Sequence, residues 1–197
     1  MLKKNQQTST LPTYQFIFSP DYWKSAAKQY TFLHIIAIST LFIPVGDNLR
    51  IKFDFLSRAV IGMVGGPFLA LSGGMIADLL GFALHPVGGF FPGYTLSAML
   101  GSLVYALFFY RSKINVIRIV LAKLTVNLFI NVLLGSVWSV IIGKYGYLYY
   151  LTSSVIKNAI MLPIECVMLY LLFTALIPVL ARMKLVPKPE KKYIPFI

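Results

Sequence analysis

A small set of charged and amide side chains stands inside otherwise apolar runs of this sequence. Burying a charge in a membrane costs several kcal/mol unless the charge is paired or hydrated, so ionisable residues in such runs are functional candidates. A cation can bind a ligand carboxylate, and amides can donate to and accept from a polar ligand. The pattern predicts noncovalent binding of a small polar molecule by residues drawn from Arg58, Asp78, His85, Asn131, Lys157 and Asn158.

A polar stripe follows the apolar segment from Val116 to Gly143. Its members, Lys123, Asn127, Asn131 and Trp138, are separated by four, four and seven residues, which places them on one face of a helix. We expect this face to point into the protein, with Asn131 and Trp138 contacting a ligand. For Asn127 an interhelical hydrogen bond is an equal alternative, and for Lys123 the alternative is snorkelling toward the cytoplasm.

The stretch from Asp78 to Ala98 is aromatic and rich in glycine. It leaves one apolar segment, breaks at His85-Pro86-Val87-Gly88-Gly89, and enters a second apolar segment. We expect an outward-facing corner in which Asp78 lies below a ligand pocket and Phe90, Phe91 and Tyr94 lie beside it. For His85 a helix-capping role is preferred over ligand contact.

Two charged residues, Lys157 and Arg58, have competing interpretations, and a third, Glu165, has no evident partner. Lys157 either binds a ligand carboxylate or pairs with Asp78, whereas for Arg58 snorkelling to the outer interface is the simpler role. Glu165 is eight residues from Lys157 on the same predicted helix, too far for a direct pair. Each of these two residues therefore needs another partner.

Motifs for covalent catalysis, metal binding and phosphate binding are missing from the sequence. We therefore expect no catalytic residue, metal or cofactor, and no ATP hydrolysis by this chain. A small intramembrane enzyme using Asp78, His85 and Glu165 is an alternative from another class. A stand-alone secondary carrier is a third hypothesis, weakened by the lack of two matching halves.

The elements that must position these residues are transmembrane helices. The 197 residues are 58% hydrophobic and 12% charged, with a mean hydropathy of +0.77, which is too apolar for a soluble domain. Only helices and closed barrels satisfy their backbone groups in lipid, and these runs lack the alternation of barrel strands. At about 20 residues per crossing, the sequence predicts an all-α bundle of six helices: Tyr22 to Val45, Phe55 to Gly65, Pro67 to Leu84, Phe90 to Tyr110, Val116 to Gly143 and Leu151 to Leu180.

The second predicted helix is too short to cross alone and ends at Gly65-Gly66-Pro67, so we expect it to form a hairpin with the third. One membrane domain, 22–182, is flanked by polar tails, 1–21 and 183–197. The outer segment from Gly46 to Asp54 alternates polar and apolar residues like a short extended segment. It is interpreted as a lid, with an ordinary connector as the alternative.

The net charge of +12 is explained by membrane orientation. Twelve of the 18 Lys and Arg residues fall on one predicted side, and only four fall on the other: Arg50, Lys52, Arg58 and Lys144. Cytoplasmic loops carry the excess of Lys and Arg. We therefore expect a multi-pass protein of the cell membrane with both termini cytoplasmic, and nucleic-acid binding is the weaker explanation of the charge.

Four sequence blocks together resemble the folate-type family of substrate-binding (S) components of energy-coupling factor (ECF) transporters. The blocks are Phe53-Asp-Phe-Leu, Gly62-Met-Val-Gly-Gly-Pro67, Gly73-Gly-Met-Ile-Ala-Asp-Leu-Leu-Gly81 and Phe91-Pro-Gly-Tyr-Thr-Leu-Ser-Ala98. The resemblance extends over roughly Phe32 to Leu180. It implies a six-helix protein that captures a water-soluble vitamin outside the cell and works with a transmembrane coupling subunit and two cytoplasmic ATPases.

One departure from that family concerns the ligand. Folate-binding members carry an arginine late in the first helix, in a Leu-Ser-Arg-Phe context, where this chain has Ser39-Thr40-Leu41. Folate brings two carboxylates, so the missing cation favours a smaller ligand with one carboxylate. The interpretation is therefore pantothenate, with folate as the alternative. The first helix also lacks the Ala-x-x-x-Ala spacing expected for contact with the coupling subunit.

Overall fold

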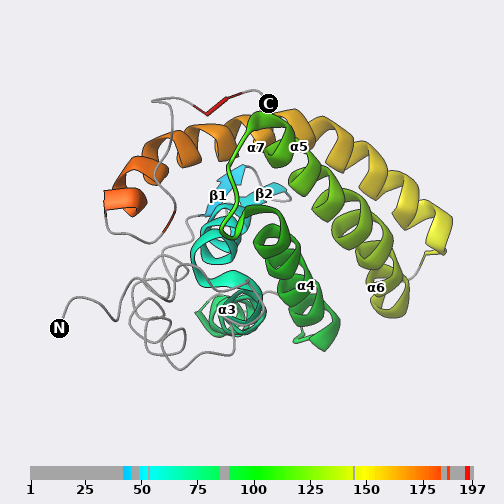
Figure 1. The fold of residues 1–197 in the computed structure, drawn as a ribbon. Coiled ribbons are helices and arrows are strands. Elements are labelled where there is room, and N and C mark those ends of the chain that lie inside the picture. The colour runs from blue at the N-terminus through cyan, green and yellow to red at the C-terminus, as the bar shows by residue number, and fades with distance from the viewer. Residues whose placement is uncertain are drawn as a thin grey trace.

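The described part of the chain is a set of long helices accompanied by one β-hairpin (Figure 1). The computed structural model describes residues 42–45, 49–52, 54–84, 89–143, 145–182, 186 and 194–195. Its elements are β1 (Phe42–Val45), β2 (Leu49–Lys52), α3 (Asp54–Leu84), α4 (Pro92–Phe109), α5 (Val116–Thr125), η2 (Val126–Leu134), α6 (Gly135–Ile142) and α7 (Tyr147–Arg182).

Four helical runs among the described residues are long and apolar enough to cross a membrane: Asp54–Ala83, Pro92–Phe109, Val116–Ile142 and Tyr147–Ala181. They contain the second to sixth predicted helices, so the expected helical membrane protein is confirmed at this level. The predicted first helix, Tyr22 to Val45, lies outside the described residues except at its end. The count of six helices stays a prediction.

The long helix α3 is two helices joined at a sharp turn. Gly66 has φ 75° and ψ −177°, a conformation that only glycine adopts readily, and Pro67 follows without a backbone donor. Ile61 Cγ2 lies 3.1 Å from the position of a Cβ added to Gly73. Twelve residues of straight helix would separate these two by about 18 Å. The two arms therefore fold back on each other, which confirms the hairpin expected at this turn.

Glycine lets α3 approach α4 down to backbone contact. A Cβ added to Gly62 would lie 2.7 Å from the backbone nitrogen of Ala106, and one added to Gly74 would lie 2.7 Å from the carbonyl oxygen of Ala98. Small residues at such crossings are the usual means of close packing in membranes. The hairpin and α4 thus form one tightly packed unit.

The aromatic core joins that unit to the rest of the bundle. Tyr105 and Phe109 of α4 stack with ring centroids 5.9 Å apart, and Phe173 of α7 meets Phe109 edge-on at 5.0 Å. All three side chains are buried, as is Ile119 of α5. In Figure 1, α7 runs along one side with α5 and α6 beside it, and α3 and α4 complete the bundle.

The run from Val116 to Ile142 is continuous but not uniform. It begins after Asn115, whose side-chain oxygen accepts from the backbone N–H of Arg118 at 2.8 Å, and it changes to π-helix in η2. π-Helical turns are rare, wider than α-helical turns, and frequently placed at functional sites. The next helix, α7, carries Pro163 and Pro178 and starts four residues before its predicted beginning at Leu151.

One sequence prediction is wrong in detail, and one segment makes contacts that the sequence did not predict. Phe42–Val45 is not the end of a helix but a strand, paired antiparallel so that Phe42 faces Lys52 and Val45 faces Leu49. Proline 44 disfavours a helix interior, and the β-branched residues around it favour a strand. In the predicted polar tail, Ile194 is buried in the core, and the Pro195 carbonyl accepts from the Val116 N–H at 3.0 Å.

Candidate functional site

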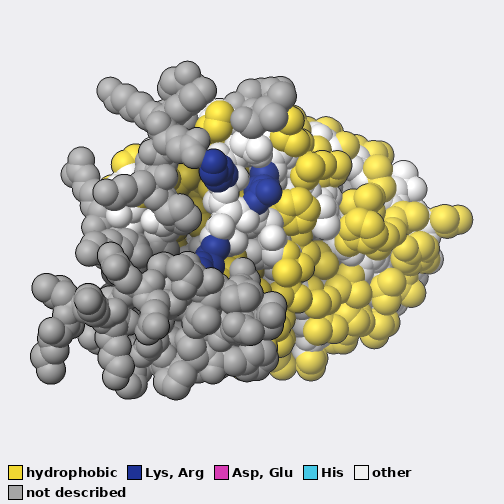
Figure 2. Space-filling model, viewed as in Figure 1, with side chains coloured by type: hydrophobic (Ala, Val, Ile, Leu, Met, Phe, Trp, Pro, Cys, Tyr) yellow, Lys and Arg dark blue, Asp and Glu magenta, His cyan; other side chains and the backbone are white. Residues whose placement is uncertain are grey.

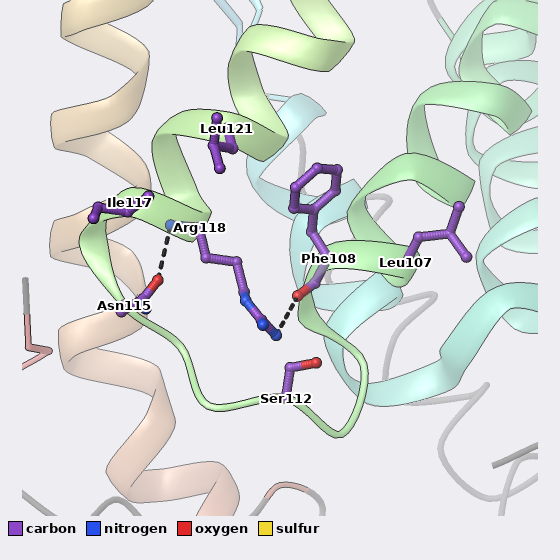
Figure 3. Close-up of a pocket in the computed structure, with 7 residues that line it drawn as sticks. All are labelled: Leu107, Phe108, Ser112, Asn115, Ile117, Arg118 and Leu121. Carbon is purple, nitrogen blue, oxygen red and sulfur yellow. Dashed lines mark hydrogen bonds between the residues drawn. The ribbon is translucent and has the colours of Figure 1, made fainter. Parts of the chain in front are cut away.

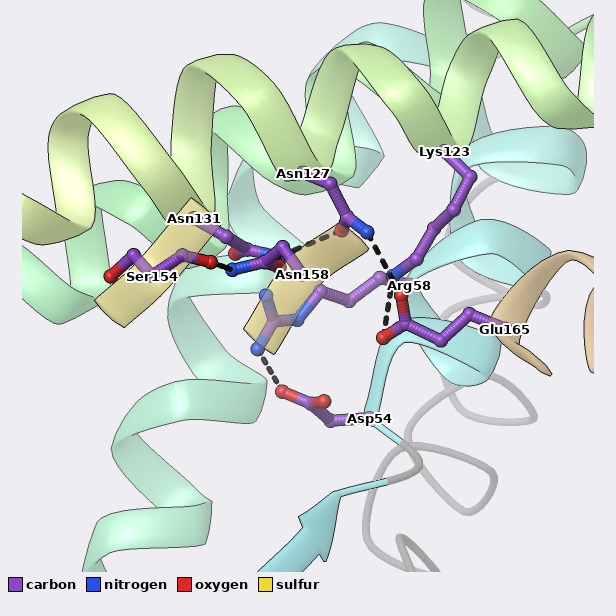
Figure 4. A network of polar contacts seen from close by, with 8 residues as sticks. All are labelled: Asp54, Arg58, Lys123, Asn127, Asn131, Ser154, Asn158 and Glu165. Carbon is purple, nitrogen blue, oxygen red and sulfur yellow. Dashed lines mark hydrogen bonds and ion pairs between the residues drawn. The ribbon is translucent and has the colours of Figure 1, made fainter. Parts of the chain in front are cut away.

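A series of linked polar side chains connects the α5–η2 run to α7 (Figure 4). At its buried end Lys123 Nζ lies 3.1 Å from Glu165 Oε1, and Asn127 donates from Nδ2 to Glu165 Oε2 at 3.0 Å. Lys123 also lies 4.2 Å from the ring centroid of Phe55 in α3. The lysine is 1% exposed, so it is held inward and does not snorkel toward the cytoplasm.

The same series of polar contacts continues toward an exposed end. Asn131 donates to Asn127 Oδ1 at 2.9 Å and to Asn158 Oδ1 at 3.4 Å. Asn158 in turn donates to the carbonyl of Ser154 at 2.9 Å. Asn127 is buried whereas Asn131 is exposed. We call this set of five residues the polar ladder: Lys123, Asn127, Asn131, Asn158 and Glu165.

The polar ladder has capacity left at its exposed end. Both hydrogen bonds that Asn131 makes to described residues use its amide nitrogen as donor, and among those residues nothing donates to its Oδ1. An exposed amide oxygen beside a second amide, Asn158, can accept from a polar ligand. Asn127 therefore serves as interhelical contact, and Asn131 is the member best placed for ligand contact.

Arg58 turns into the protein from the first half of α3. It forms an ion pair with Asp54 one turn earlier, and its Nη1 lies 3.8 Å from the position of a Cβ on Gly101 of α4. The side chain is 21% exposed. The guanidinium is therefore directed at α4 and Asp54, as Figure 4 also shows for Asp54. Snorkelling to the outer interface, the role that the sequence favoured for Arg58, does not describe this direction.

A second cluster, the aromatic corner, consists of Phe91, Tyr94 and Trp138. The Phe91 ring meets the rings of Tyr94 and Trp138 edge-on, each with centroids 5.6 Å apart. Trp138 donates from Nε1 to Ser97 Oγ at 2.9 Å. Tyr94 is 47% exposed, so the corner presents an open aromatic surface.

Asp78 lies next to this corner, as the sequence predicts. Its Oδ2 accepts from Thr95 Oγ1 at 2.8 Å, which ties the end of α3 to the start of α4. Asp78 does not pair with Lys157, so that alternative is wrong. Lys157 is exposed, and in the part of the chain that the structure describes no ion pair of its side chain is found.

The structure divides the predicted stripe between two neighbours. Asn131 contacts α7, whereas Trp138 contacts α4. The wider turns of η2 change the angle per residue, so seven positions no longer return a side chain to the same face. The interpretation that all four residues share one face is therefore wrong for Trp138. His85 lies outside the described residues.

Several contributing residues were not among the predicted site residues. Glu165 completes the ladder, Asp54 holds Arg58, and Ser97 positions Trp138. Asp54 and Arg58 are spaced i,i+4, a signal that the sequence offers for an ion pair. The partner of Glu165 depends on how α7 packs, which local spacing does not encode.

Two buried hydroxyls of α4, Ser102 Oγ and Tyr105 OH, have no hydrogen-bond partner among the residues that the structure describes. Ser102 follows Gly101, where the Arg58 guanidinium approaches. A buried hydroxyl without a partner costs free energy, so such groups mark positions where water or a ligand completes the bond. These hydroxyls extend the polar interior from the ladder toward α4.

The proposed enzyme constellation is not assembled. Asp78 is bonded to Thr95 and Glu165 to Lys123, in separate clusters. Within the described ranges no group of three or more His, Cys, Asp or Glu side chains could hold a metal ion. The arrangement offers cations, amides and aromatic faces, which suit binding rather than bond breaking.

Apolar helices around a polar, partly exposed interior define a membrane-embedded solute-binding protein. A folate transporter FolT of Clostridium novyi is 37% identical over 123 residues, 62% of this chain and 71% of the relative. A folate transporter FolT of Leuconostoc mesenteroides is 33% identical over 137 residues, 66% and 74% of the two chains. No protein-family model matches the chain.

A solved structure agrees with these relatives. The crystal structure of FolT bound with folic acid superimposes with a TM-score of 0.63 at 31% identity, covering 75% of this chain and 90% of that one. This chain belongs to the folate-type family of ECF S components. It is a vitamin-binding transport subunit and not an enzyme. The expectation of pantothenate gains no support from these relatives.

Proposed function

We propose that this chain captures folate for import. The observation that carries the proposal is the likeness to FolT bound with folic acid, which extends over 90% of that chain. The relatives named as folate transporters point in the same direction. The proposal replaces pantothenate, which the sequence favoured because Thr40 stands where folate-binding members carry arginine.

The two clusters suit an elongated ligand. Asn131 of the polar ladder and Trp138 of the aromatic corner are seven residues apart on one helical run, about 10 Å along its axis. Folate has a flat pterin ring at one end and a glutamate with two carboxylates at the other. Aromatic faces and amides complement the ring, and cations complement the carboxylates.

Two described residues can take the place of the arginine that folate-binding members carry late in the first helix. Arg58 is directed inward and already binds one carboxylate, that of Asp54. Lys157 stands exposed on α7, one residue before Asn158 of the ladder. A guanidinium can bind a carboxylate through two parallel hydrogen bonds, so Arg58 is the stronger candidate. Thr40 lies outside the described residues.

Family membership supports a proposal about the transport partners. We propose that the chain works with a transmembrane coupling subunit and two cytoplasmic ATPases, with both termini on the cytoplasmic side of the cell membrane. The unequal distribution of Lys and Arg supports this orientation. On this orientation the segment from Gly46 to Asp54 falls on the outer side, in keeping with its proposed role as a lid.

Mass spectrometry tests the ligand directly. One portion of the purified full chain is denatured, and the released small molecule is identified. A second portion is freed of ligand while still folded, and folic acid and pantothenate are titrated onto it. We expect folate in the released fraction and saturable binding of folic acid without competition by pantothenate. Release and binding of pantothenate alone would overturn the folate assignment and leave the family unchanged.

Variants test the site. Arg58→Gln and Lys157→Met each remove a cation that we assign to the carboxylates, so each should weaken folic acid binding by roughly 1.5 to 3 kcal/mol. Lys113→Gln removes the same charge from the α4–α5 connection and serves as the matched control. If both cation variants bind like the control, the carboxylates of folate are held elsewhere.

A further inference from the structure

A cavity of about 510 Å³, whose lining includes no residue of the polar ladder or the aromatic corner, lies where α4 ends and α5 begins. Candidate spans end at Phe109 and begin at Val116 on either side of it, so the cavity lies at the boundary of the membrane. Figure 3 shows its lining side chains, which come from both helices and the connection between them: Leu107, Phe108, Ser112, Asn115, Ile117, Arg118 and Leu121.

Arg118 supplies the polar wall of the cavity. Its Nη1 donates to the carbonyl of Phe108 at 3.2 Å, and this bond holds the guanidinium across the cavity toward Ser112 (Figure 3). A guanidinium has five donors. Among the described residues no other side-chain hydrogen bond or ion pair of Arg118 is found, so several donors face the cavity ready for an anion.

The surroundings of the cavity are strongly positive. Arg111 and Lys113 are exposed on the connection between α4 and α5. The sequence has no Asp or Glu between Asp78 and Glu165, so the connection itself contributes only positive charge. Figure 2 shows Lys and Arg side chains gathered on this face, with hydrophobic surface beside them.

Aliphatic side chains form the other wall. Leu107 is 66% exposed, Leu121 is 47% exposed and Ile117 is 38% exposed. A free phosphate would leave these side chains unused, and an acidic protein segment would contact the cations without covering them. A phospholipid satisfies both walls, because its phosphate meets the cation while its acyl chains lie along the aliphatic side chains.

We propose that this cavity binds the headgroup of an anionic phospholipid in the membrane leaflet at the α4–α5 connection. Basic pockets between membrane helices on the cytoplasmic side are suited to such headgroups. The bound lipid fixes the end of α4 at headgroup depth. This site is separate from the folate site, so neither proposal depends on the other.

Binding to defined lipids tests the proposal. The full chain is purified in a neutral detergent, and native mass spectrometry measures retention of phosphatidylglycerol and of phosphatidylcholine. We expect preferential retention of phosphatidylglycerol, weakened about tenfold or more by Arg118→Gln because a charge-assisted contact is lost. Lys144→Gln, which removes the same charge from the segment between α6 and α7, should retain the lipid.

A second variant guards against a folding defect, because Arg118 also bonds to Phe108. Leu107→Asn changes only an exposed aliphatic side chain and should weaken retention while folic acid binding stays normal. Equal retention of both lipids, or unchanged retention in Arg118→Gln and Leu107→Asn, overturns the proposal. Displacement of phosphatidylglycerol by millimolar inorganic phosphate, or by an acidic peptide, overturns it in favour of a free anion or a protein partner.

Discussion

Two helix pairs in this protein are held together by different chemistry. The hairpin α3 packs on α4 through glycines that bring backbones into contact, whereas the α5–η2 run meets α7 through the polar ladder. In an apolar 18-residue window of each helix, 67% of the α3 window is buried but only 17% of the α7 window. The first pair is therefore a closely packed scaffold, and the second is tied by a few directional contacts beside the proposed ligand.

Loss of the buried cation should break the second pair most severely. Lys123→Met leaves the Glu165 carboxylate, 13% exposed, with Asn127 as its one hydrogen-bond partner among the described side chains. We therefore expect a loss of about 3 kcal/mol or more in unfolding free energy. The double variant Lys123→Met/Glu165→Leu removes both charges and should recover most of that stability. Denaturant titration of the purified protein in detergent measures both. A double variant no more stable than the single one would contradict the pairing.

The scaffold should break through crowding. Gly74→Val places atoms against the Ala98 carbonyl and Ser102 Oγ, each 2.7 Å from the added Cβ, so we expect a loss of about 3 kcal/mol. Gly81 has nothing within 4 Å of an added Cβ. Gly81→Ala, the matched control, should be neutral or slightly stabilising. Equal thermal stability of the two variants would show that α4 does not approach α3 this closely.

The exposed end of the ladder should affect ligand more than fold. Asn131→Ala removes the amide oxygen that we assign to ligand contact, so folic acid binding should weaken by about 1 kcal/mol while the melting temperature changes little. Ser154→Ala alters a neighbour that contributes only its backbone carbonyl to Asn158, and serves as control. A large loss of stability with normal affinity would make Asn131 a structural residue.

The smallest expected effect on stability comes from the hydrogen bond between Trp138 and Ser97 of α4. Trp138→Phe and Ser97→Ala each remove one end of a single hydrogen bond, so their effects on stability should be coupled by about 0.6 kcal/mol in a double-mutant cycle. Trp138→Phe and Asn158→Ala should instead add independently. Coupling to Asn158 would restore the single polar face that the sequence predicts.

The sequence was sufficient for features set by local chemistry. Hydropathy located the helices of the described part, and Gly66 before Pro67 located the hairpin because both residues limit the backbone directly. The spacing of Asn127 and Asn131 placed them together on one face. The π-helix that redirects Trp138 and the partner of Glu165 depend on tertiary packing, which no local spacing specifies.

The ligand shows a further limit of sequence comparison at one position. Thr40 suggested that the folate cation was missing, and so favoured pantothenate. Arg58 stands in another helix and was interpreted as an interfacial residue, because its depth was judged from its place in the sequence. Its inward direction follows from the space that Gly101 leaves on α4.

The hydrogen bond from the Val116 N–H to the Pro195 carbonyl makes the C-terminal segment a cap for the start of α5. The first N–H groups of an α-helix have no partner within that helix. One of those at the start of α5 is satisfied by a carbonyl almost 80 residues further along the chain, with Ile194 buried beside it. Shortening the protein ahead of Ile194 would uncover both the N–H group and the apolar contact. An affinity tag is therefore better fused to the N-terminus than joined directly after Pro195.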